Sequence, residues 1–263
     1  MKKRVLSAML VAAMAMTAMP SQTFAEGALD AAQQTGKLSY DGYKEVWSDE
    51  FDGDSLNRAD WNVETHEKGW VNNELQEYVD SSENIQVKDG KLIINPVKKV
   101  TDGDTGSTKE AASYTSGRVS TQNKQTFIYG RFECRAKVPK GQGYLPAFWL
   151  MANDENVYGQ WPRCGEIDCM EVMGQETNKA YGTLHYGNPH SQSQGTYTIT
   201  DGADFSDDFH IYTCDWESGK ITWYVDGVKY HEESEWHSTT VGQGTLAVSY
   251  THLRAHETDQ YLV

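Results

Sequence analysis

Three carboxylates stand close together in the segment 165–171, which reads GEIDCME. The segment has the apolar content of a buried strand, where alternate side chains face the same side, so Glu166 and Asp168 share one face. Strict alternation would turn Glu171 into the core, where an unpaired carboxylate is costly. A β-bulge at Cys169-Met170 adds one residue and returns Glu171 to the face of the other acids. We therefore predict a row of three acids along a cleft, with an apolar backing from Ile167, Cys169 and Met170.

Such a row suits the hydrolysis of glycosidic bonds, which needs one carboxylate as nucleophile and one protonated carboxyl group as proton donor to the leaving oxygen. A gap of about 5 to 5.5 Å between these two groups would give retention of configuration. Asp168, between the two glutamates, would supply negative charge that keeps one neighbour protonated. Spacing alone leaves two other interpretations open, because acidic clusters on strands also form solvated outer faces and cation sites.

Aromatic residues accompany the acidic segment. Trp161 stands just before it and Trp149 ends another apolar run, in a chain with eight tryptophans and 15 tyrosines. Flat apolar faces beside acids are what a sugar ring needs, so these residues favour the catalytic interpretation. The remaining tryptophans that we assign, all to the core, are Trp47, Trp61, Trp216 and Trp223.

The elements that must position these residues read as short strands. Asp89-Gly90 and Asp226-Gly227 each stand between alternating apolar runs, the best short-range signal for a β-hairpin. Further strands are predicted in FIYGRFECRAKV, YLPAFWLM, GEIDCMEVM, AYGTLHYG and DFHIYTCDWE, each bounded by turn-forming residues. Long helical periodicity is absent, so the pattern indicates an all-β antiparallel sandwich or barrel, and we choose the sandwich.

Charge and cysteine content narrow the partners. A formal net charge of −15 disfavours nucleic acid and strongly anionic polysaccharides, and favours a neutral ligand. The cysteines, Cys134, Cys164, Cys169 and Cys214, lack the paired spacing of a zinc site. We expect buried free thiols or at most one disulfide, and no metal ligands.

Both ends of the chain differ from its middle. Residues 1–25 combine a basic head, an apolar run of about 15 residues and a small-residue cleavage site, which predicts a secretory signal peptide; a membrane span would need about 20 apolar residues. Residues 26–43 read as a leader. Residues 248–263, beginning VSYTHLRAHET, resemble the codon-by-codon translation of a sequencing-library adapter. We expect them to be read-through, the native chain to continue beyond Ala247, and its final strands to be missing.

Residues 44–247 resemble glycoside hydrolase family 16, in particular its laminarinase-like endo-β-1,3-glucanases. The resemblance rests on VWSDEFDG, GWVNNELQEYV, YTSGRV, YGRFECRAKVP, LPAFWLM, WPRCGEIDCMEVMG, GTLHYG, and FHIYTCDW followed by WYVDG, in that order. It implies a jelly-roll sandwich with a concave substrate cleft and a retaining mechanism. The form E-x-D-x-x-E, with its extra Met170, points to the laminarinase branch.

The resemblance also implies roles for single residues. Glu166 matches the nucleophile, Asp168 the assisting acid, and Glu171 the general acid/base. The matches to substrate contacts are His185, Trp161, Trp149, Arg118 and Asn73. Cys169 departs from the family by replacing an aliphatic residue. No cofactor is implied for catalysis; a structural calcium ion near Glu50 and Gly53 is expected only for the full-length protein, because its side-chain ligand belongs to the final strand.

These observations predict a secreted, monomeric endo-glucanase that acts outside the cell, without a membrane anchor after signal cleavage. Its expected substrate is a neutral β-glucan, either laminarin-like or of mixed linkage. Two alternatives stay open: a non-catalytic β-glucan-binding module, and a hydrolase of another neutral polysaccharide such as agarose. A third possibility is that the chain as written does not fold stably. The presence of both Glu166 and Glu171 favours the enzyme, because binding alone gains nothing from paired acids.

Overall fold

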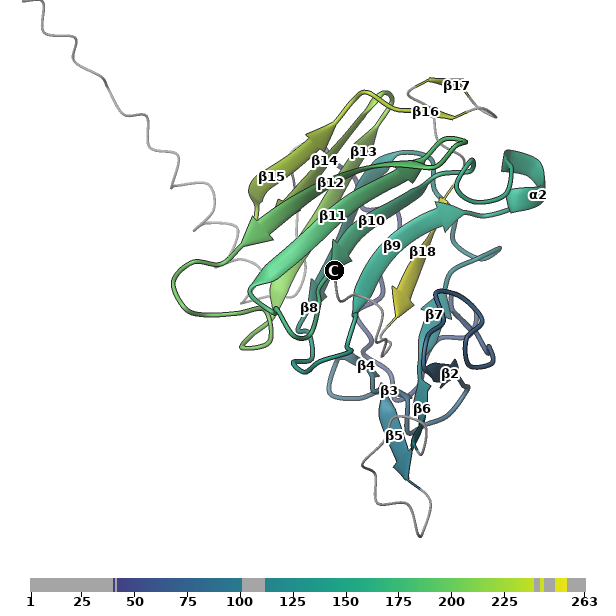
Figure 1. The fold of residues 1–263 in the computed structure, drawn as a ribbon, viewed down its shortest axis with the longest axis vertical. Helices are drawn as coiled ribbons and strands as arrows, with labels where there is room; N and C mark the ends of the chain where they lie inside the picture. The colour runs from purple at the N-terminus through teal and green to yellow at the C-terminus, as the bar shows by residue number, and fades with distance from the viewer. Residues whose placement is uncertain (1–39, 41, 101–111, 239–241, 244–248, 255–263) are drawn as a thin grey trace, which may run out of the picture.

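Two antiparallel sheets lie face to face and form a β-sandwich in the computed structural model, which describes residues 40, 42–100, 112–238, 242–243 and 249–254 (Figure 1). In spatial order, the large sheet contains β1 (Asn62–Val63), β7 (Arg118–Ser120), β18 (Ser249–Arg254), β9 (Ala147–Ala152), β10 (Glu166–Glu171), β11 (Lys179–Tyr186) and β12 (Ser191–Thr198). The small sheet contains β15 (Val228–Glu233), β14 (Lys220–Val225), β13 (His210–Glu217) and β8 (Gly130–Ala136). The predicted all-β sandwich is confirmed.

Shorter elements surround the sandwich. One small sheet joins β2 (Gln76–Tyr78), β6 (Ala112–Ser116) and β5 (Val97–Val100), and two hairpins pair β3 (Ile85–Val87) with β4 (Leu92–Ile94) and β16 (His237–Ser238) with β17 (Gly242–Gln243). The helix α2 (Glu155–Tyr158) is the one α-helix of the described residues, and no helix among them is long and apolar enough to cross a membrane.

Both predicted Asp-Gly hairpins are present. Asp89 and Gly90 connect β3 to β4 with φ angles of 53° and 66°, and Asp226 and Gly227 connect β14 to β15 with 49° and 77°. Positive φ at both central residues is the geometry that matches the twist of the flanking strands. The strands predicted around β8, β9, β10, β11 and β13 are also confirmed, with ends shifted by a few residues.

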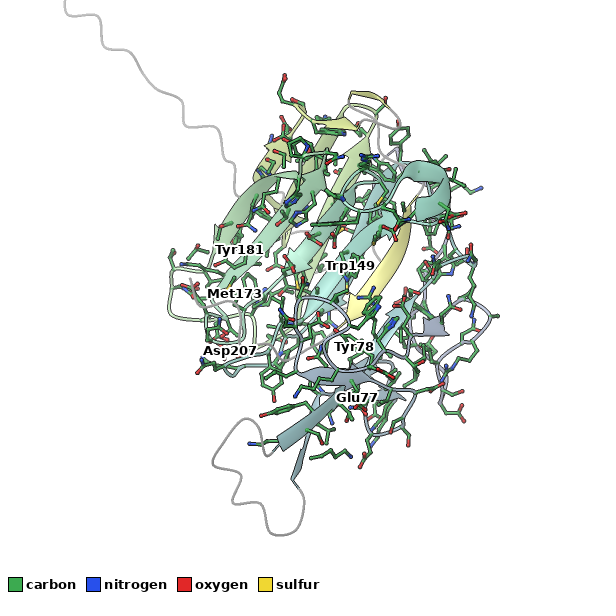
Figure 2. All side chains as sticks on the ribbon, turned by 45° about the vertical axis from the view of Figure 1, so that its right-hand side comes forward. Glu77, Tyr78, Trp149, Met173, Tyr181 and Asp207 are labelled. Atoms are coloured by element: carbon green, nitrogen blue, oxygen red, sulfur yellow. The ribbon has the colours of Figure 1, made fainter. Side chains whose placement is uncertain are left out.

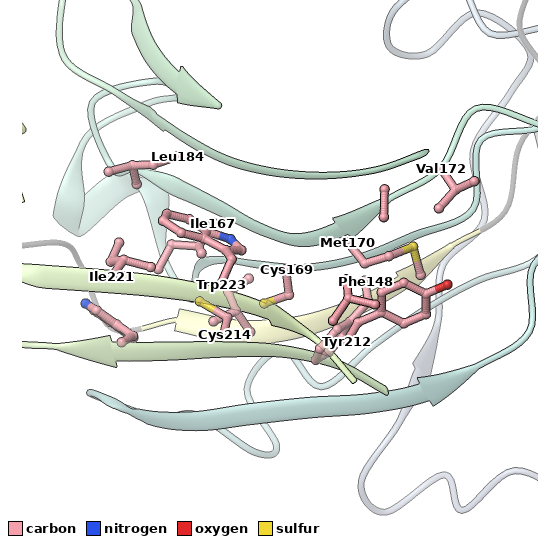
Figure 3. Close-up of a cluster of buried hydrophobic side chains, with 14 of the residues drawn as sticks. Phe148, Ile167, Cys169, Met170, Val172, Leu184, Tyr212, Cys214, Ile221 and Trp223 are labelled. Carbon is pink, nitrogen blue, oxygen red and sulfur yellow. The ribbon is translucent and has the colours of Figure 1, made fainter. Parts of the chain in front are cut away.

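The core lies between the two sheets. Phe148, Leu150, Ile167 and Leu184 from the large sheet meet Tyr212, Trp216, Ile221 and Trp223 from the small sheet, and all are at most 3% exposed. Figure 3 shows the centre of this cluster, where Cys169 of β10 and Cys214 of β13 lie between the layers. All four cysteines are in the described part of the chain and all are free thiols. Burial and contact with Cys214 raise the pKa of Cys169 well above its ordinary value.

Most of the tryptophans assigned to the core are in it. Trp216 and Trp223 are fully buried between the sheets, and Trp61 is 2% exposed in a second cluster with Val119, Ile85 and Val87. Trp47 is half-buried and packs against that second cluster. The second cluster holds β1, β7 and the β3–β4 hairpin together at the end of the large sheet.

Part of the segment that we expect to be read-through forms a strand of the large sheet. Residues Ser249–Arg254 form β18, which pairs with β7 on one side and with β9 on the other. Strand pairing uses backbone groups, so an opening between two strands can accept a segment whatever its side chains. The predicted signal peptide, the leader up to residue 39, and residues 244–248 and 255–263 lie outside the described residues. Their assignments stay predictions.

Candidate active site

The acidic segment contains the predicted bulge. On one side, Asp168 pairs with Thr183 and Glu171 with Tyr181, so three steps along β10 correspond to two along β11. On the other side, Asp168 pairs with Trp149 and Met170 with Phe148, which places the extra residue between Asp168 and Met170. Because Thr183 and Tyr181 are two residues apart, Glu171 returns to the face of Asp168.

Burial along β10 agrees with this register. Glu166 and Glu171 are half-exposed at the two ends of the strand, while Ile167, Cys169 and Met170 are at most 3% exposed and belong to the core. The predicted apolar backing is therefore confirmed. The face that carries the acids is the side of the large sheet that points away from the small sheet.

Register defines the neighbours of each acid on that face. Glu166 lies between Met151 of β9 and His185 of β11, Asp168 between Trp149 and Thr183, and Glu171 between Ala147 and Tyr181. Each row continues to β12, at Gln192, Gln194 and Thr196. Near the middle of the sheet, the acids are thus bordered by the Trp149 ring and the His185 imidazole. Toward the edge at β12, their neighbours carry hydroxyl and amide groups.

Asp168 is the most buried of the three acids, with 2% of its surface exposed. Its Oδ2 atom lies 3.2 Å from Nε2 of His185, and its backbone carbonyl accepts a hydrogen bond of 2.9 Å from Nε1 of Trp223. A bulge disrupts the regular ladder, and Trp223 reaches across from the small sheet to this carbonyl. Buried tryptophans thus both fill the core and hold the bulge.

Trp161 covers the end of the acidic row at Glu166. The loop that carries it follows α2, whose N-terminus is capped by Asp154. Glu155 of α2 accepts a hydrogen bond of 2.7 Å from the Trp161 backbone, and Nε1 of Trp161 donates a bond of 2.6 Å to Oε2 of Glu166. Trp161 is 44% exposed, so this residue is partly open to solvent beside the carboxylate.

His190 was not found from the sequence. It lies in the turn between β11 and β12, and its Nε2 atom is 3.0 Å from Nδ1 of His185. The Trp161 ring lies close to both imidazoles, with centroid distances of 6.0 Å to His185 and 4.9 Å to His190. The only sequence signal was a second histidine after the turn-forming pair Asn188-Pro189, and contact through space was needed to interpret it.

Arg118 and Trp149 lie together beneath the surface. Trp149 is 3% exposed, and the Arg118 guanidinium, in a residue that is 4% exposed, stands 4.8 Å from its ring centre. The same guanidinium is 6.0 Å from the ring centre of Tyr78, and its Nε donates a hydrogen bond of 2.5 Å to Glu64. Figure 2 labels Trp149 and Tyr78 on this part of the molecule. Trp149 is therefore a buried residue next to Asp168, and not the exposed substrate contact that the family resemblance implies.

Asn73 lies in an exposed turn before β2 that is closed by a hydrogen bond of 3.0 Å from the Gly69 N–H to the Glu74 carbonyl. The same turn carries Trp70, which the sequence analysis did not single out. Its ring is 47% exposed and stacks flat on His66 at 3.5 Å, and Arg118 lies 5.1 Å from its centre. Arg118 thus connects this turn to Trp149 and through it to the acids.

The calcium ion that the family resemblance implies for the full-length protein would be bound by carbonyl groups near Glu50 and Gly53 and by a side chain of the final strand. Among the described residues, no three His, Cys, Asp or Glu side chains gather closely enough to hold a metal ion. That observation concerns side chains alone, so the calcium site expected for the full-length protein stays a prediction.

Comparison with known proteins places the chain among polysaccharide hydrolases. The family model "Glycosyl hydrolases family 16" matches residues 72–246. A "Glucan endo-1,3-beta-glucosidase A1" from Niallia circulans is 39% identical over 209 residues, and a "Glucan endo-1,3-beta-glucosidase" from Cryptopygus antarcticus is 42% identical over 192 residues. The X-ray structure of an endo-β-1,3-glucanase from Pyrococcus furiosus superposes with a TM-score of 0.66 at 33% identity, over 81% of this chain and 83% of that one.

Coverage of the two relatives differs. The aligned part is 74% of this chain but 30% of the Niallia protein, and 72% of this chain and 68% of the Cryptopygus protein. The chain thus spans less than a third of the first relative and about two thirds of the second.

Proposed function

The chain belongs to glycosyl hydrolase family 16, and on that premise we propose that it is an endo-acting glucan hydrolase that cleaves internal β-1,3 bonds. Its proposed substrates are laminarin-like or mixed-linkage β-glucans. The observation that carries this proposal is the bulge in β10, which sets Glu166, Asp168 and Glu171 on one face of the large sheet. The names of the Niallia, Cryptopygus and Pyrococcus relatives, all β-1,3-glucan hydrolases, support the linkage.

The proposed mechanism is double displacement. A Glu166 carboxylate oxygen attacks the anomeric carbon while the glycosidic C–O bond breaks and Glu171 transfers its proton to the leaving oxygen. Water then attacks the glycosyl ester, Glu171 takes its proton, and the Glu166 carboxylate leaves. The configuration is inverted twice and is therefore retained.

The spacing of the two glutamates is compatible with this scheme. With one residue absorbed by the bulge, their Cα atoms are four strand positions apart, which is roughly 13 Å. Two glutamate side chains that lean toward each other can bring their carboxyl groups near the gap of about 5 to 5.5 Å that retention needs. The 2.6 Å bond from Trp161 fixes one oxygen of Glu166 and leaves the other for attack.

Asp168 is proposed to assist by its charge. A carboxylate between two others favours the protonated form of a neighbour, which is the form that Glu171 needs in the first step. The His185 contact at 3.2 Å favours the ionised form of Asp168 itself. One strand can in this way hold an ionised nucleophile and a protonated acid at the same pH.

The proposal is tested by replacing each glutamate. Glu166→Ala and Glu171→Ala should both lose turnover of laminarin, by more than about a thousandfold, since each removes an obligatory step. Release of reducing ends measures the loss, and lichenan and agarose serve as comparison substrates. Azide should rescue only Glu166→Ala, because a small anion can replace the missing nucleophile but not the missing proton donor.

Other outcomes would identify the alternatives. Full activity of either variant would contradict the mechanism. A folded wild-type protein that binds laminarin without cutting it would indicate a binding module, and cleavage of agarose but not laminarin would indicate another substrate of the same site.

We further propose that the protein acts outside the cell as a monomer on a neutral polysaccharide, without a cofactor. The basic and apolar residues 1–25 support export, and the net charge of −15 supports a neutral partner. Determination of the N-terminus of the mature protein from culture medium tests the export.

A further inference from the structure

A line of contacts runs from the molecular surface to the buried Asp168. His190 is exposed in the β11–β12 turn, and its Nε2 lies 3.0 Å from Nδ1 of His185. Nε2 of His185 lies 3.2 Å from Oδ2 of Asp168. Side-chain exposure falls along this line, to 19% for His185 and 3% for Asp168. A surface imidazole is therefore connected to the central acid through one other ring.

The hydrogen positions on this line are constrained. An ionised carboxylate only accepts hydrogen bonds, so Nε2 of His185 carries a hydrogen toward Asp168. With both rings neutral, Nδ1 of His185 is then an acceptor and Nε2 of His190 must donate to it. If the pair gains one proton, His185 can carry both hydrogens and His190 becomes the acceptor. Partial burial and the neighbouring His185 lower the pKa of His190, which favours the neutral His190 ring.

The surroundings hold the two rings in place. Their centroids are 5.2 Å apart at an angle of 25°, and the Trp161 ring lies against both. The turn that carries His190 is held by Arg163, whose Nε lies 2.9 Å from the side-chain oxygen of Asn188 in the amide orientation that satisfies both groups. The titratable groups that interact with this line are Glu166 of β10, which acts on His190, and Cys169 of β10 and Tyr230 of β15, which interact with Asp168. Glu155 and Arg163 hold the loop and the turn that carry Trp161 and His190.

We propose that His190 is a positioning residue: its hydrogen bond to His185 holds Nε2 of His185 against Asp168, and so keeps Asp168 ionised between the two glutamates. This inference rests on the proposed function of the same site. Without the bond, the His185 ring can rotate and its hydrogen leaves the carboxylate. Asp168 is then more easily protonated, and its assistance to both glutamates is lost as the pH falls.

Kinetics of His190→Phe test the inference, since phenylalanine keeps an aromatic ring next to Trp161 but has no nitrogen. We expect kcat on laminarin to fall by up to about tenfold, the upper end of what one neutral hydrogen bond contributes, with KM within about twofold. The acidic limb of the pH–rate profile should move to higher pH. His190→Gln, which retains an N–H donor, should restore most of kcat and the position of the limb.

A double mutant shows whether His190 acts through His185 or independently of it. His185→Phe should shift the acidic limb at least as far as His190→Phe, and adding His190→Phe to His185→Phe should cause no further shift. Additive shifts of the two variants, or an unchanged acidic limb in His190→Phe, would overturn the inference.

A measurement without substrate distinguishes failure of this inference from failure of the proposed function. The ¹⁵N resonance of His185 Nδ1 reports the hydrogen bond that this atom makes, so at neutral pH it should move in His190→Phe and remain close to wild type in His190→Gln. An inactive wild-type protein that shows this pattern would contradict only the proposed function. A resonance that does not move in His190→Phe would contradict the role of His190.

Discussion

Trp70 presents a flat, half-exposed ring at the surface, supported from behind by His66 and near Arg118. Such a ring can stack on a sugar far from the bond that is cleaved. We expect Trp70→Ala to raise KM for laminarin about fivefold, the size of one aromatic contact, and to leave kcat within twofold. Steady-state kinetics measure both. Tyr43→Ala is the matched control, because Tyr43 is also 50% exposed but packs on Tyr40 at the start of the described chain.

A change in kcat with unchanged KM in Trp70→Ala would assign Trp70 to the support of Arg118 and not to the polysaccharide. An equal rise in KM for Tyr43→Ala would show that the effect is not specific to this turn.

The residues of the site differ in how far the sequence could predict them. Glu166, Asp168 and Glu171 follow from alternation and from the cost of burying a carboxylate, both of which act within one strand. His190 and Trp70 depend on contacts between separate segments, so local sequence patterns were not sufficient to place them in the site. Trp149 stands in an apolar run that fits both a cleft lining and a buried support, and burial under Arg118 distinguished the two.

Two glycines allow the sheets to approach behind the acids. Gly182 of β11 pairs with Gly195 of β12, and a Cβ atom on Gly182 would lie 2.5 Å from Cδ1 of Trp223 and 2.4 Å from the Tyr230 hydroxyl. Trp223 in turn donates to the Asp168 carbonyl at the bulge. Gly182→Ala should therefore lower the free energy of unfolding by about 1 to 3 kcal/mol, as overpacking does, and reduce kcat by displacing Trp223.

Denaturant unfolding and laminarin assays check this prediction. Gly53→Ala is the control, since the nearest atom to its Cβ would be 3.6 Å away, an ordinary contact. Unchanged stability of Gly182→Ala would mean that Trp223 and Tyr230 can move aside without cost.

Elements were predictable where a local signal existed. Both Asp-Gly hairpins and the apolar strands had one. The strand β12, SQSQGTYT, was missed because its side chains are polar on both faces at the end of the large sheet, where no alternation marks it. The four-residue helix α2 was also too short for a helical period to be visible.

At the scale of the whole molecule, Asp204 connects the segment before β13 to the segment after β8. It lies before β13, contacts Lys140 from the segment after β8, and accepts a bond of 2.9 Å from the Ser206 N–H. The bond from Lys140, followed by those from Ser206, holds the pKa of Asp204 well below its usual range. A carboxylate with a lowered pKa contributes stability above its ordinary value of about 3.9, and this contribution is lost as the pH falls below that value.

Asp204→Asn should consequently lower Tm at pH 7 and lower it by less near pH 2, because the contribution of the wild-type carboxylate shrinks progressively once the pH is below about 3.9. Thermal unfolding followed by circular dichroism measures both values. Asp54→Asn, at an exposed site, is the control and should not change the pH dependence. A Tm difference between the wild-type protein and Asp204→Asn that persists unchanged at low pH would assign the effect of the substitution to packing.

The fold of the whole molecule was predictable as a class, because many short strands with turn signals leave few architectures. The order of the strands was not predictable. For example, β9 and β10 pair although 13 residues, including α2, separate Ala152 from Glu166. The place of Ser249–Arg254 between β7 and β9 was equally unforeseen, because backbone pairing leaves no trace in the side-chain pattern.

The bulge in β10 has a consequence for how chain length can vary. Loss or gain of one residue in a strand ordinarily inverts every later side chain between inside and outside. Here the extra residue between Asp168 and Met170 is already absorbed, so removal of one residue would leave the acids at alternate positions, still on one side. This stretch of strand can therefore change by one codon while the parity of its carboxylates is preserved, a freedom that the neighbouring strands β9 and β11 do not have.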